Sequence, residues 1–418
     1  FFFFKQKTAY EIPKRDWSSD VCSSDLIGLE QNGTPYHLLT LTSASEGTTK
    51  REGDHLTVRT HITRALMPLV KPGPVRLVVR ASRTILPRLR EASSQASRDL
   101  QARFEPPRAE ILSTFHYINQ GGAELVVYRA TPADVASGVR VGDIAYRGFP
   151  AAGEGLNDPS IHVAFFALLH DQDPAAPVVV YARDAGGTEA TAAVDHKVFP
   201  KPFARSRIPL DDAFLQRVVP AIASATPDMH LSTAPADLLA SFLKINGELR
   251  QRNGQTLVDL AKTTAPRMLW AEAFQPLSNA KVEAKFADSR TYVYQGKDVD
   301  HQTHLGFDLA VTQHVPVVAA NRGVVLHASD LGIYGNCIVV DHGLGVQSLY
   351  GHLSSIEVKV GQSVSKGQVM GRSGTTGLAG GDHLHFTMLV DGHPVNPVEW
   401  WDPKWMQDRV FRKLGTKN

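Results

Sequence analysis

The chain has 418 residues, of which 43% are hydrophobic and 8% aromatic, a composition typical of a globular protein with two or three hydrophobic cores. Its 44 Lys and Arg residues balance 42 Asp and Glu residues, so the net charge of +2 gives no reason to expect nucleic acid or an anionic surface as the main partner. No apolar run approaches the roughly 18 residues of a membrane-spanning helix. The two cysteines, Cys22 and Cys337, form no CxxC pair, which argues against a cysteine-built metal site.

The first 26 residues, FFFFKQKTAYEIPKRDWSSDVCSSDL, lack the basic-then-apolar layout of a signal peptide and show no amphipathic period. They resemble the in-frame translation of a synthetic sequencing adapter, because KQKTAYEI (5–12) and RDWSSDVCSSDL (15–26) look like its two halves. We therefore expect residues 1–26 to be an artefact, with the native N-terminus and any export signal or inner-membrane anchor missing. A disordered native tail is the alternative.

Residues 27–206 predict a β-rich accessory region of immunoglobulin-like type. Short runs rich in Val, Ile, Tyr and Phe are separated by Pro- and Gly-containing turn signals. The runs are VRLVVR (75–80), ELVVYR (124–129), HVAFFALL (162–169) and PVVVYA (177–182). The charged, Ser- and Gln-rich stretch 83–108 predicts a helix or a linker between two β modules. No nucleophile, base and acid cluster in this region, so we expect it to bind, space or cover a site rather than catalyse.

Residues 207–273 predict a short helical connector, because the apolar period changes from two to about 3.6 residues. The helical patterns cover 210–222, 234–245 and 247–262, and good helix formers fill them. Met229, Phe242 and Leu243 are interpreted as core residues of this segment.

Strands resume after residue 273, and we interpret 274–401 as one domain and 402–418 as a C-terminal tail. The predicted fold class is therefore mainly β, with N-terminal β-sandwich-like modules, the helical connector and a C-terminal antiparallel β domain. Nine of the 17 histidines lie between residues 301 and 393. They are His301, His304, His314, His327, His342, His352, His383, His385 and His393. This uneven distribution is the first indication of a functional site.

Two pairs of residues in this domain have a spacing that suits metal binding. His304 and Asp308 stand at i and i+4, and their neighbours favour a strand, on which even spacing places both side chains on one face. His383 and His385 are an i, i+2 pair that shares a face of a second predicted strand. Two such strands together offer His, Asp and His to one divalent ion. Three N and O ligands with one open position are typical of a catalytic zinc site.

A further histidine, His352, follows a predicted strand at 337–341 and is a candidate for handling protons. With three ligand positions filled, His352 and one of His383 and His385 remain for this task, and the spacing does not decide which of the pair. The pieces together indicate a hydrolase. We interpret His301, His314, His327, His342 and His393 as structural. Asp341 and Asp382 are candidates for orienting ligand histidines.

Three separated motifs and the glycine-containing segments between them resemble the lysostaphin/LytM-type zinc endopeptidases over residues 286–397. The motifs are His304-x-x-x-Asp308, Tyr350-x-His352-Leu353 and His383-x-His385, separated by GVV (323–325), YGN (334–336) and GQSVSKGQ (361–368). The resemblance implies an antiparallel β fold with a narrow groove. It also implies hydrolysis of peptide bonds in peptidoglycan stems or cross-links by a metal-activated water.

Carried over position by position, the resemblance implies that His304, Asp308 and His385 bind one Zn²⁺ ion. It likewise implies that His352 and His383 are the catalytic residues. The accessory regions loosely resemble those of Gram-negative envelope members, so we expect peptidoglycan as the partner, a periplasmic location and cleavage of a meso-diaminopimelate cross-link, with a glycine bridge as the alternative. The competing function is a non-catalytic LytM-like protein that binds the wall or activates another hydrolase.

Two further local features concern the family pattern and the segment before the HxH pair. Val315-Pro316 stands where the family often has Gly-Thr-Pro, a departure that lies away from the motifs. The Gly-rich segment 371–381 directly precedes the HxH pair. It is either a groove rim that lets an extended peptide approach closely or simply two tight turns. HExxH, GxSxG and GxxxxGK[ST] are absent, so other common hydrolase and nucleotide motifs give no competing prediction.

Overall fold

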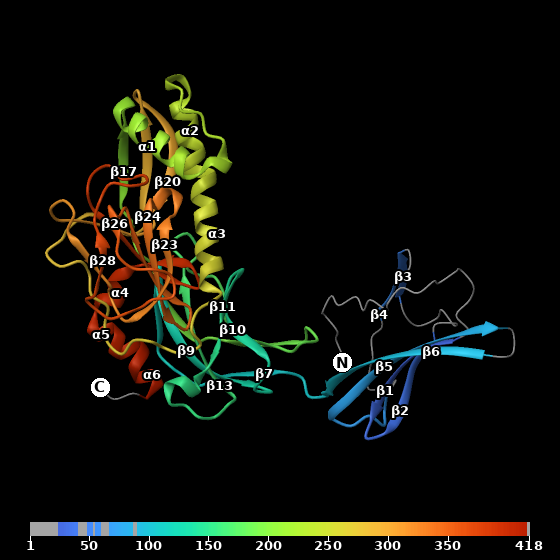
Figure 1. The fold of residues 1–418 in the computed structure, drawn as a ribbon. Helices are drawn as coiled ribbons and strands as arrows, with labels where there is room; N and C mark the ends of the chain where they lie inside the picture. The colour runs from blue at the N-terminus through green and yellow to red at the C-terminus, as the bar shows by residue number, and fades with distance from the viewer. Residues whose placement is uncertain (1–23, 41–47, 53–54, 60–66, 87–89, 416–418) are drawn as a thin grey trace. The chain divides into compact units, whose positions relative to one another are not determined.

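The computed structural model describes residues 24–40, 48–52, 55–59, 67–86 and 90–415, and the chain divides into two compact units (Figure 1). Unit 1 comprises residues 1–107 and 183–189, and unit 2 comprises 108–182 and 190–418. The chain is mainly β with predominantly antiparallel sheets, which confirms the predicted fold class. Among the described residues, no helix has the length and apolar character needed to cross a membrane.

Unit 1 is built on one four-stranded antiparallel sheet in the order β2-β1-β5-β6, with a separate β3-β4 hairpin. Its strands are β1 (Ser24–Gln31), β2 (Thr34–Thr40), β3 (Thr48–Glu52), β4 (His55–Arg59), β5 (Gly73–Leu86) and β6 (Arg90–Ala102). The helix or linker predicted over 83–108 is wrong, because β6 pairs with β5 along most of its length. An edge strand tolerates the polar sequence of β6, since one side of it faces solvent. Of the predicted artefact 1–26, residues 1–23 lie outside the described residues and 24–26 begin β1.

Unit 2 begins with two four-stranded sheets, in the orders β11-β10-β14-β15 and β12-β13-β9-β7, and a parallel β16-β8 pair. The elements are β7 (Arg108–Ile111), β8 (His116–Asn119), β9 (Gly122–Thr131), β10 (Ala136–Val141), β11 (Ile144–Arg147), β12 (Phe149–Pro150), η1 (Ala151–Glu154), β13 (Ile161–Leu168), β14 (Val178–Arg183), β15 (Glu189–Ala193) and β16 (His196–Phe199). The apolar runs predicted at 124–129, 162–169 and 177–182 lie largely in β9, β13 and β14.

A helical segment follows and shares a core with later strands. It contains β17 (Arg205–Leu210), α1 (Asp212–Ala225), η2 (Pro227–Met229), η3 (Pro235–Asp237), α2 (Leu238–Lys244), η4 (Ile245–Leu249) and α3 (Arg250–Ala261). The Asp211 side chain caps α1 by accepting a hydrogen bond from the Phe214 amide. Phe242 is 1% exposed, as predicted, and packs in one cluster with Tyr292 and Ile333. The helices therefore pack against the domain that follows them.

The C-terminal part contains a large antiparallel sheet in the order β18-β21-β29-β25-β24-β23-β27, to which β30 adds beside β29. A second sheet joins β17, β19 and β20, and a third joins β22, β28 and β26. The elements are β18 (Lys281–Ala284), β19 (Asp288–Tyr294), β20 (Lys297–His304), β21 (Phe307–Ala310), β22 (Pro316–Val318), β23 (Gly323–Asp330), η5 (Gly332–Tyr334), β24 (Asn336–Gly343), β25 (Val346–Gly351), β26 (Ser355–Ile356), β27 (Ser363–Val364), β28 (Val369–Arg372), β29 (Leu384–Val390), β30 (His393–Val395), α4 (Pro397–Trp401), α5 (Pro403–Met406), η6 (Gln407–Phe411) and α6 (Arg412–Leu414). Most residues of β24, β25 and β29 are buried, and these include polar residues such as Asp341, Gln347 and Ser348.

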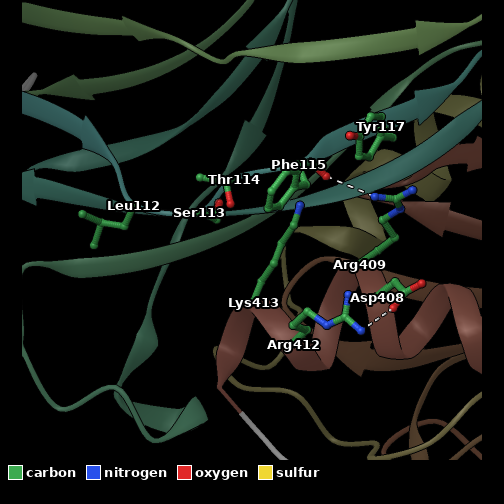
Figure 2. A pocket seen from close by; sticks show the side chains of 9 residues that line it. All are labelled: Leu112, Ser113, Thr114, Phe115, Tyr117, Asp408, Arg409, Arg412 and Lys413. Carbon is green, nitrogen blue, oxygen red and sulfur yellow. Dashed lines mark hydrogen bonds and ion pairs between the residues drawn. The ribbon is translucent and has the colours of Figure 1, made fainter.

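The C-terminal helices fasten this domain to the preceding β sheets. The Lys413 ammonium, with a side chain only 6% exposed, pairs with the fully buried Glu124 carboxylate at 2.9 Å. Arg409 donates to the carbonyl oxygen of Phe115 at 3.1 Å, beside a surface cavity of about 570 Å³ (Figure 2). The apolar core also runs continuously from the β sheets into this domain, with the Phe165 and Trp400 rings 5.6 Å apart.

Candidate metal centre

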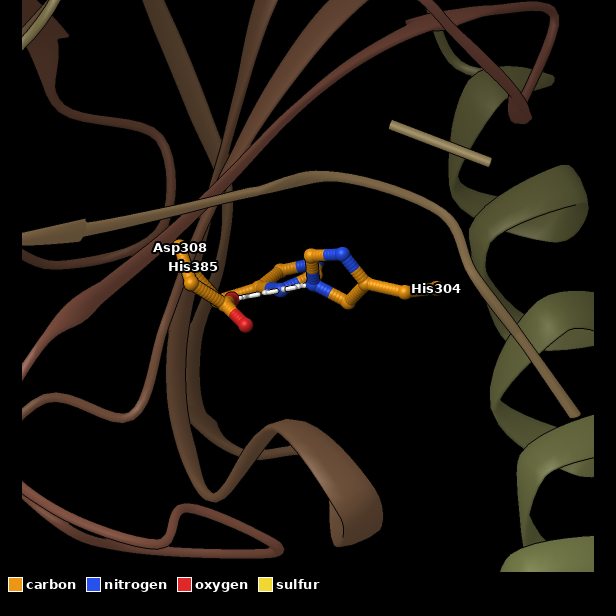
Figure 3. Close-up of side chains that lie close together, drawn as sticks. All are labelled: His304, Asp308 and His385. Carbon is orange, nitrogen blue, oxygen red and sulfur yellow. Dashed lines mark hydrogen bonds and ion pairs between the residues drawn. The ribbon is translucent and has the colours of Figure 1, made fainter. Parts of the chain in front are cut away.

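Three side chains converge in the C-terminal domain (Figure 3). His304 ends β20, Asp308 lies in β21, and His385 lies in β29 directly opposite Asp308 in the strand register. His304 Nε2 lies 2.9 Å from Asp308 Oδ1 and 3.0 Å from His385 Nδ1. The third side of the triangle, from His385 Nδ1 to Asp308 Oδ1, is 3.0 Å. All three side chains are buried or nearly so.

The predicted placement of His304 and Asp308 on one strand is wrong. The chain leaves β20 after His304 and enters β21, in a different sheet, at Phe307. Gly306 lies in this turn, where a Cβ atom would come within 2.5 Å of the His385 imidazole. A glycine is therefore needed, because no side chain fits between the turn and His385. The two residues meet through a bend rather than through strand alternation.

The hydrogen bonds on the far side of each imidazole determine which nitrogen carries a proton. The His304 Nδ1 faces the Lys285 carbonyl oxygen at 3.1 Å, and since a carbonyl only accepts, Nδ1 donates. The Thr387 hydroxyl donates to the Leu305 carbonyl oxygen at 2.7 Å, so toward His385 Nε2, 3.0 Å away, it accepts. In the neutral rings, His304 Nε2 and His385 Nδ1 therefore carry lone pairs.

This donor set suits a cation. Two nitrogen lone pairs and a carboxylate oxygen face one another with no proton between them, an arrangement that is repulsive unless a positive charge lies among them. Burial lowers the pKa of His385 to about 4, so this ring is neutral near pH 7. Burial disfavours the charged form of Asp308, but the neighbouring His304, His383 and His385 hold its pKa well below the usual range. The spacing is close to the roughly 3.4 Å between ligand atoms of a tetrahedral zinc.

The other oxygen of the Asp308 carboxylate is held by a residue that the sequence motifs do not indicate, Arg290. The Arg290 Nη2 donates to Asp308 Oδ2 at 3.0 Å, and its Nε donates to Asp288 Oδ2 at 3.3 Å. The Ser206 hydroxyl lies 2.8 Å from each oxygen of the buried Asp288. Asp288 and Arg290 stand at i and i+2 on β19, a spacing that could have revealed a shared strand face.

His352 and His383 lie beside the three-residue cluster. The ring centroid of His352 is 4.8 Å from that of His383 and 5.7 Å from that of His385. His352 Nδ1 donates to the Thr376 carbonyl oxygen at 2.8 Å, and His383 Nδ1 donates to the Gly381 carbonyl oxygen at 2.8 Å. Each ring therefore turns its Nε2 atom away from the loop carbonyl, and His383 Nε2 lies 3.4 Å from Asp308 Oδ1.

The surroundings shift the two pKa values in opposite directions. Burial lowers the pKa of His352 well below its ordinary value, and the neighbouring His383 and His385 add to this. Burial also opposes protonation of His383, but the hydrogen bond and charge of Asp308 outweigh it and raise the pKa. Paired groups with separated pKa values are typical of acid–base sites.

The Gly-rich segment 371–381 wraps around these histidines. It carries both carbonyl acceptors, Thr376 O and Gly381 O. Gly377 has φ +67° and passes so close to residues 333–335 that a Cβ atom would lie 2.4 Å from the Gly335 nitrogen. The segment thus does more than turn the chain, because its backbone orients two imidazoles.

The remaining predicted polar residues lie in other environments. His342 is fully buried between the Arg322 carbonyl oxygen and the Ser348 hydroxyl, and burial lowers its pKa to about 4. Asp341 accepts hydrogen bonds from Thr264, Ala265 and Gly343, and Asp382 from Ser373 and the His314 amide. Neither carboxylate hydrogen-bonds to His304 or His385 in the structure. The orienting role that the sequence suggests for the two carboxylates is instead filled by backbone carbonyls, Thr387 and Arg290.

Comparisons with known proteins agree with this geometry. Residues 302–397 match peptidase family M23. The chain is 42% identical over 95 residues to the DD-carboxypeptidase/endopeptidase Mpg of Neisseria meningitidis serogroup B, a match that covers 23% of this chain and 22% of the relative. It is 32% identical over 164 residues to the peptidoglycan DD-endopeptidase ShyA of Vibrio cholerae, covering 38% of this chain and 34% of the relative. The chain thus matches about a fifth to a third of the length of these relatives.

Among solved structures, the catalytic domain of the antimicrobial peptidase lysostaphin from Staphylococcus simulans is similar at 28% identity with a TM-score of 0.27. That match covers 31% of this chain and 98% of the solved one. The match to peptidase family M23 thus lies in the C-terminal part of the chain, at residues 302–397, where the lysostaphin/LytM resemblance was found.

Proposed function

We propose that this protein is a zinc-dependent endopeptidase that cleaves peptide bonds in peptidoglycan. The observation that carries the proposal is the tautomeric arrangement of the site. His304, Asp308 and His385 point three unprotonated atoms toward one another. The hydrogen bonds on the far side of the two imidazoles explain why the facing nitrogens carry no proton. A non-catalytic wall-binding domain has no chemical need for this arrangement or for the two further imidazoles beside it.

In this proposal His304 Nε2, Asp308 Oδ1 and His385 Nδ1 hold one Zn²⁺ ion. When bound, zinc polarises the scissile carbonyl and makes water a usable nucleophile near neutral pH. Arg290 holds Asp308 Oδ2 and so keeps Oδ1 turned toward the two imidazoles. The bend at Gly306 and the β21–β29 register place the carboxylate against His385 without any side chain between them.

His352 and His383 handle protons in this proposal. Because each ring donates Nδ1–H to a backbone carbonyl, its Nε2 is the atom that accepts a proton from the attacking water. The same Nε2–H then donates to the developing oxyanion or protonates the departing amine. The fixed carbonyl contacts keep both rings aimed while the proton moves.

The substrate we propose is the meso-diaminopimelate cross-link. The similar proteins are named a DD-carboxypeptidase/endopeptidase in Neisseria and a peptidoglycan DD-endopeptidase in Vibrio. Because glycine is achiral, a DD specificity favours this bond over a glycine bridge. Peptidoglycan lies outside the cytoplasmic membrane, so the proposal places the protein in the cell envelope, with the periplasm as its compartment.

Digestion of purified sacculi tests the function. The zinc-loaded protein should release uncross-linked stem peptides from diaminopimelate-type sacculi, identified by mass spectrometry, and His352→Ala should not. Sacculi with glycine bridges serve as the matched substrate control. If the loaded protein binds about one zinc but releases nothing from either wall type, while binding sacculi or activating another hydrolase, the non-catalytic alternative replaces the proposal.

A further inference from the structure

Two loops of the M23 domain hold the proposed catalytic histidines in place. The first loop, 332–335, supplies the Tyr334 carbonyl oxygen, which accepts the His352 amide at 2.7 Å. The second loop, 374–381, supplies the carbonyl acceptors of the His352 and His383 imidazoles. The positions of both rings therefore depend on where these two loops lie.

The two loops contact each other closely enough to move together. The Leu378 amide donates to the Ile333 carbonyl oxygen at 2.9 Å. Glycines at both crossing points permit this contact, since a Cβ atom on Gly335 or on Gly377 would come within 2.5 Å of the opposite loop. A displacement of one loop is therefore transmitted to the other.

The helical segment before the domain makes polar and apolar contacts with the second loop. The Arg217 guanidinium, on α1, donates from Nη2 to the Ala379 carbonyl oxygen at 2.8 Å. The same guanidinium lies 5.4 Å from the Phe214 ring centroid, so it is held over an aromatic face. The Leu378 side chain packs against the helical core cluster that contains Phe242.

The helical segment also contacts the first loop. Asn253, on α3, is only 5% exposed, and its Oδ1 accepts the Ile333 amide at 3.0 Å. The Ile333 side chain is itself a member of the helical core cluster. Gly332 passes Asn253 so closely that a Cβ atom would lie 2.7 Å from Asn253 Oδ1. Both loops are thus anchored from outside residues 302–397.

We propose that helices α1 and α3 are a working part of the catalytic site, in which Arg217 and Asn253 are positioning residues for His352 and His383. The catalytic half of this inference rests on the proposed function. Short loops without strand partners are mobile unless anchored, and a displacement of about 1 Å at a catalytic group can cost roughly 100-fold in rate. The helical segment, which the sequence predicts to be a connector, thus fixes the orientation of the two imidazoles.

The test compares Arg217→Ala and Asn253→Ala with Gln216→Ala in the full zinc-loaded chain. Gln216 is the matched control, because it is an exposed neighbour of the exposed Arg217 on the same helix. We expect both positioning variants to keep about one zinc, to lose roughly 10- to 100-fold in kcat and to change KM little. Arg217→Lys, which retains a donor, should recover part of kcat.

A second readout needs no activity. Amide hydrogen exchange at Leu378 should be roughly tenfold faster in Arg217→Ala than in Gln216→Ala, and the imidazole Nδ1–H signals of His352 and His383 should weaken or shift in nitrogen-15 NMR. Unchanged exchange and imidazole signals would overturn the positioning role, whatever the wild type does to sacculi. If these signals change but the wild type cleaves nothing, the proposed function fails and the anchoring stands. Since Arg217 is exposed, its variant remains informative even if Asn253→Ala fails to fold.

Discussion

The Arg290 guanidinium donates to Oδ2 of Asp308 at 3.0 Å, and this contact leaves Oδ1 of the same carboxylate facing His304 and His385. A carboxylate free to rotate would present either oxygen. Arg290 removes that freedom. It is itself held by the buried Asp288, whose carboxylate also accepts a hydrogen bond from the Ser206 hydroxyl. A chain of polar contacts thus runs from β17 through β19 to the proposed metal ligand.

Replacement of Arg290 should weaken zinc binding without abolishing it. We expect Arg290→Ala to lower zinc affinity about 10- to 100-fold, the usual effect of removing a group that orients a ligand. Arg290→Lys should recover little, because an ammonium lacks the planar fork that spans Asp308 and Asp288. Competition with a chelator of known affinity measures this, with the exposed Arg372→Ala as control. Wild-type affinity in Arg290→Ala would contradict the orienting role.

Removal of a proposed ligand should have a larger effect. His304→Ala, Asp308→Ala and His385→Ala each leave two protein ligands, so zinc content after dialysis should fall far below one equivalent and peptidase activity should be lost with it. Elemental analysis by mass spectrometry measures the zinc, and circular dichroism checks that the sheets persist. Retention of one equivalent by any of the three variants would show that the residue is not a ligand.

Removal of a proposed catalytic histidine should separate zinc content from turnover. His352→Ala and His383→Ala keep all three ligands, so zinc should stay near one equivalent while turnover on sacculi falls by about 10²- to 10⁴-fold.

The sharpest control is the pair His383 and His385, which lie two residues apart and face Asp308 through different nitrogens. If His383→Ala loses zinc and His385→Ala keeps it, the two roles are reversed. If both variants keep zinc and full activity, the metallopeptidase proposal is wrong.

Glu399 should make stability depend on pH. Burial raises the pKa of Glu399 from 4.5 to about 7, and the hydrogen bonds from Asn119 and the Ala123 amide offset this only in part. The folded state therefore binds a proton that the unfolded state releases between these values. The stabilisation from this proton is complete below about pH 4.5 and is lost as pH rises to about 7.

The variant Glu399→Gln stays neutral at every pH and therefore isolates this contribution. Relative to it, the wild-type free energy of unfolding should fall by about 1.4 kcal/mol per pH unit between pH 5 and 7 and then level off. Urea denaturation of both proteins at a series of pH values measures the difference. A difference that does not vary with pH would contradict a raised pKa in the folded state.

Local patterns were sufficient for much of the fold and failed where pairing partners were distant. The period of about 3.6 located α1, α2 and α3 to within a few residues, because an amphipathic helix forms from its own neighbours. The stretch 83–108 contains an edge strand instead of the predicted helix or linker, because the polar sequence of β6 is compatible with pairing to β5. Spacing alone predicts His304 and Asp308 on one strand, because it does not show a bend such as that at Gly306.

Sequence alone determined the mainly β class, the helical segment and the five residues that the fold brings together, since apolar period and motif spacing are properties of short stretches. Only the tertiary structure decided which nitrogen of each imidazole faces the centre, because the deciding hydrogen bonds come from Lys285, Thr387 and two loop carbonyls. It alone revealed the role of Arg290 in holding Asp308 and the hydrogen bond from Arg217 to the Ala379 carbonyl oxygen. The two residues of that hydrogen bond are 162 positions apart. Such contacts arise from packing, which no local spacing records.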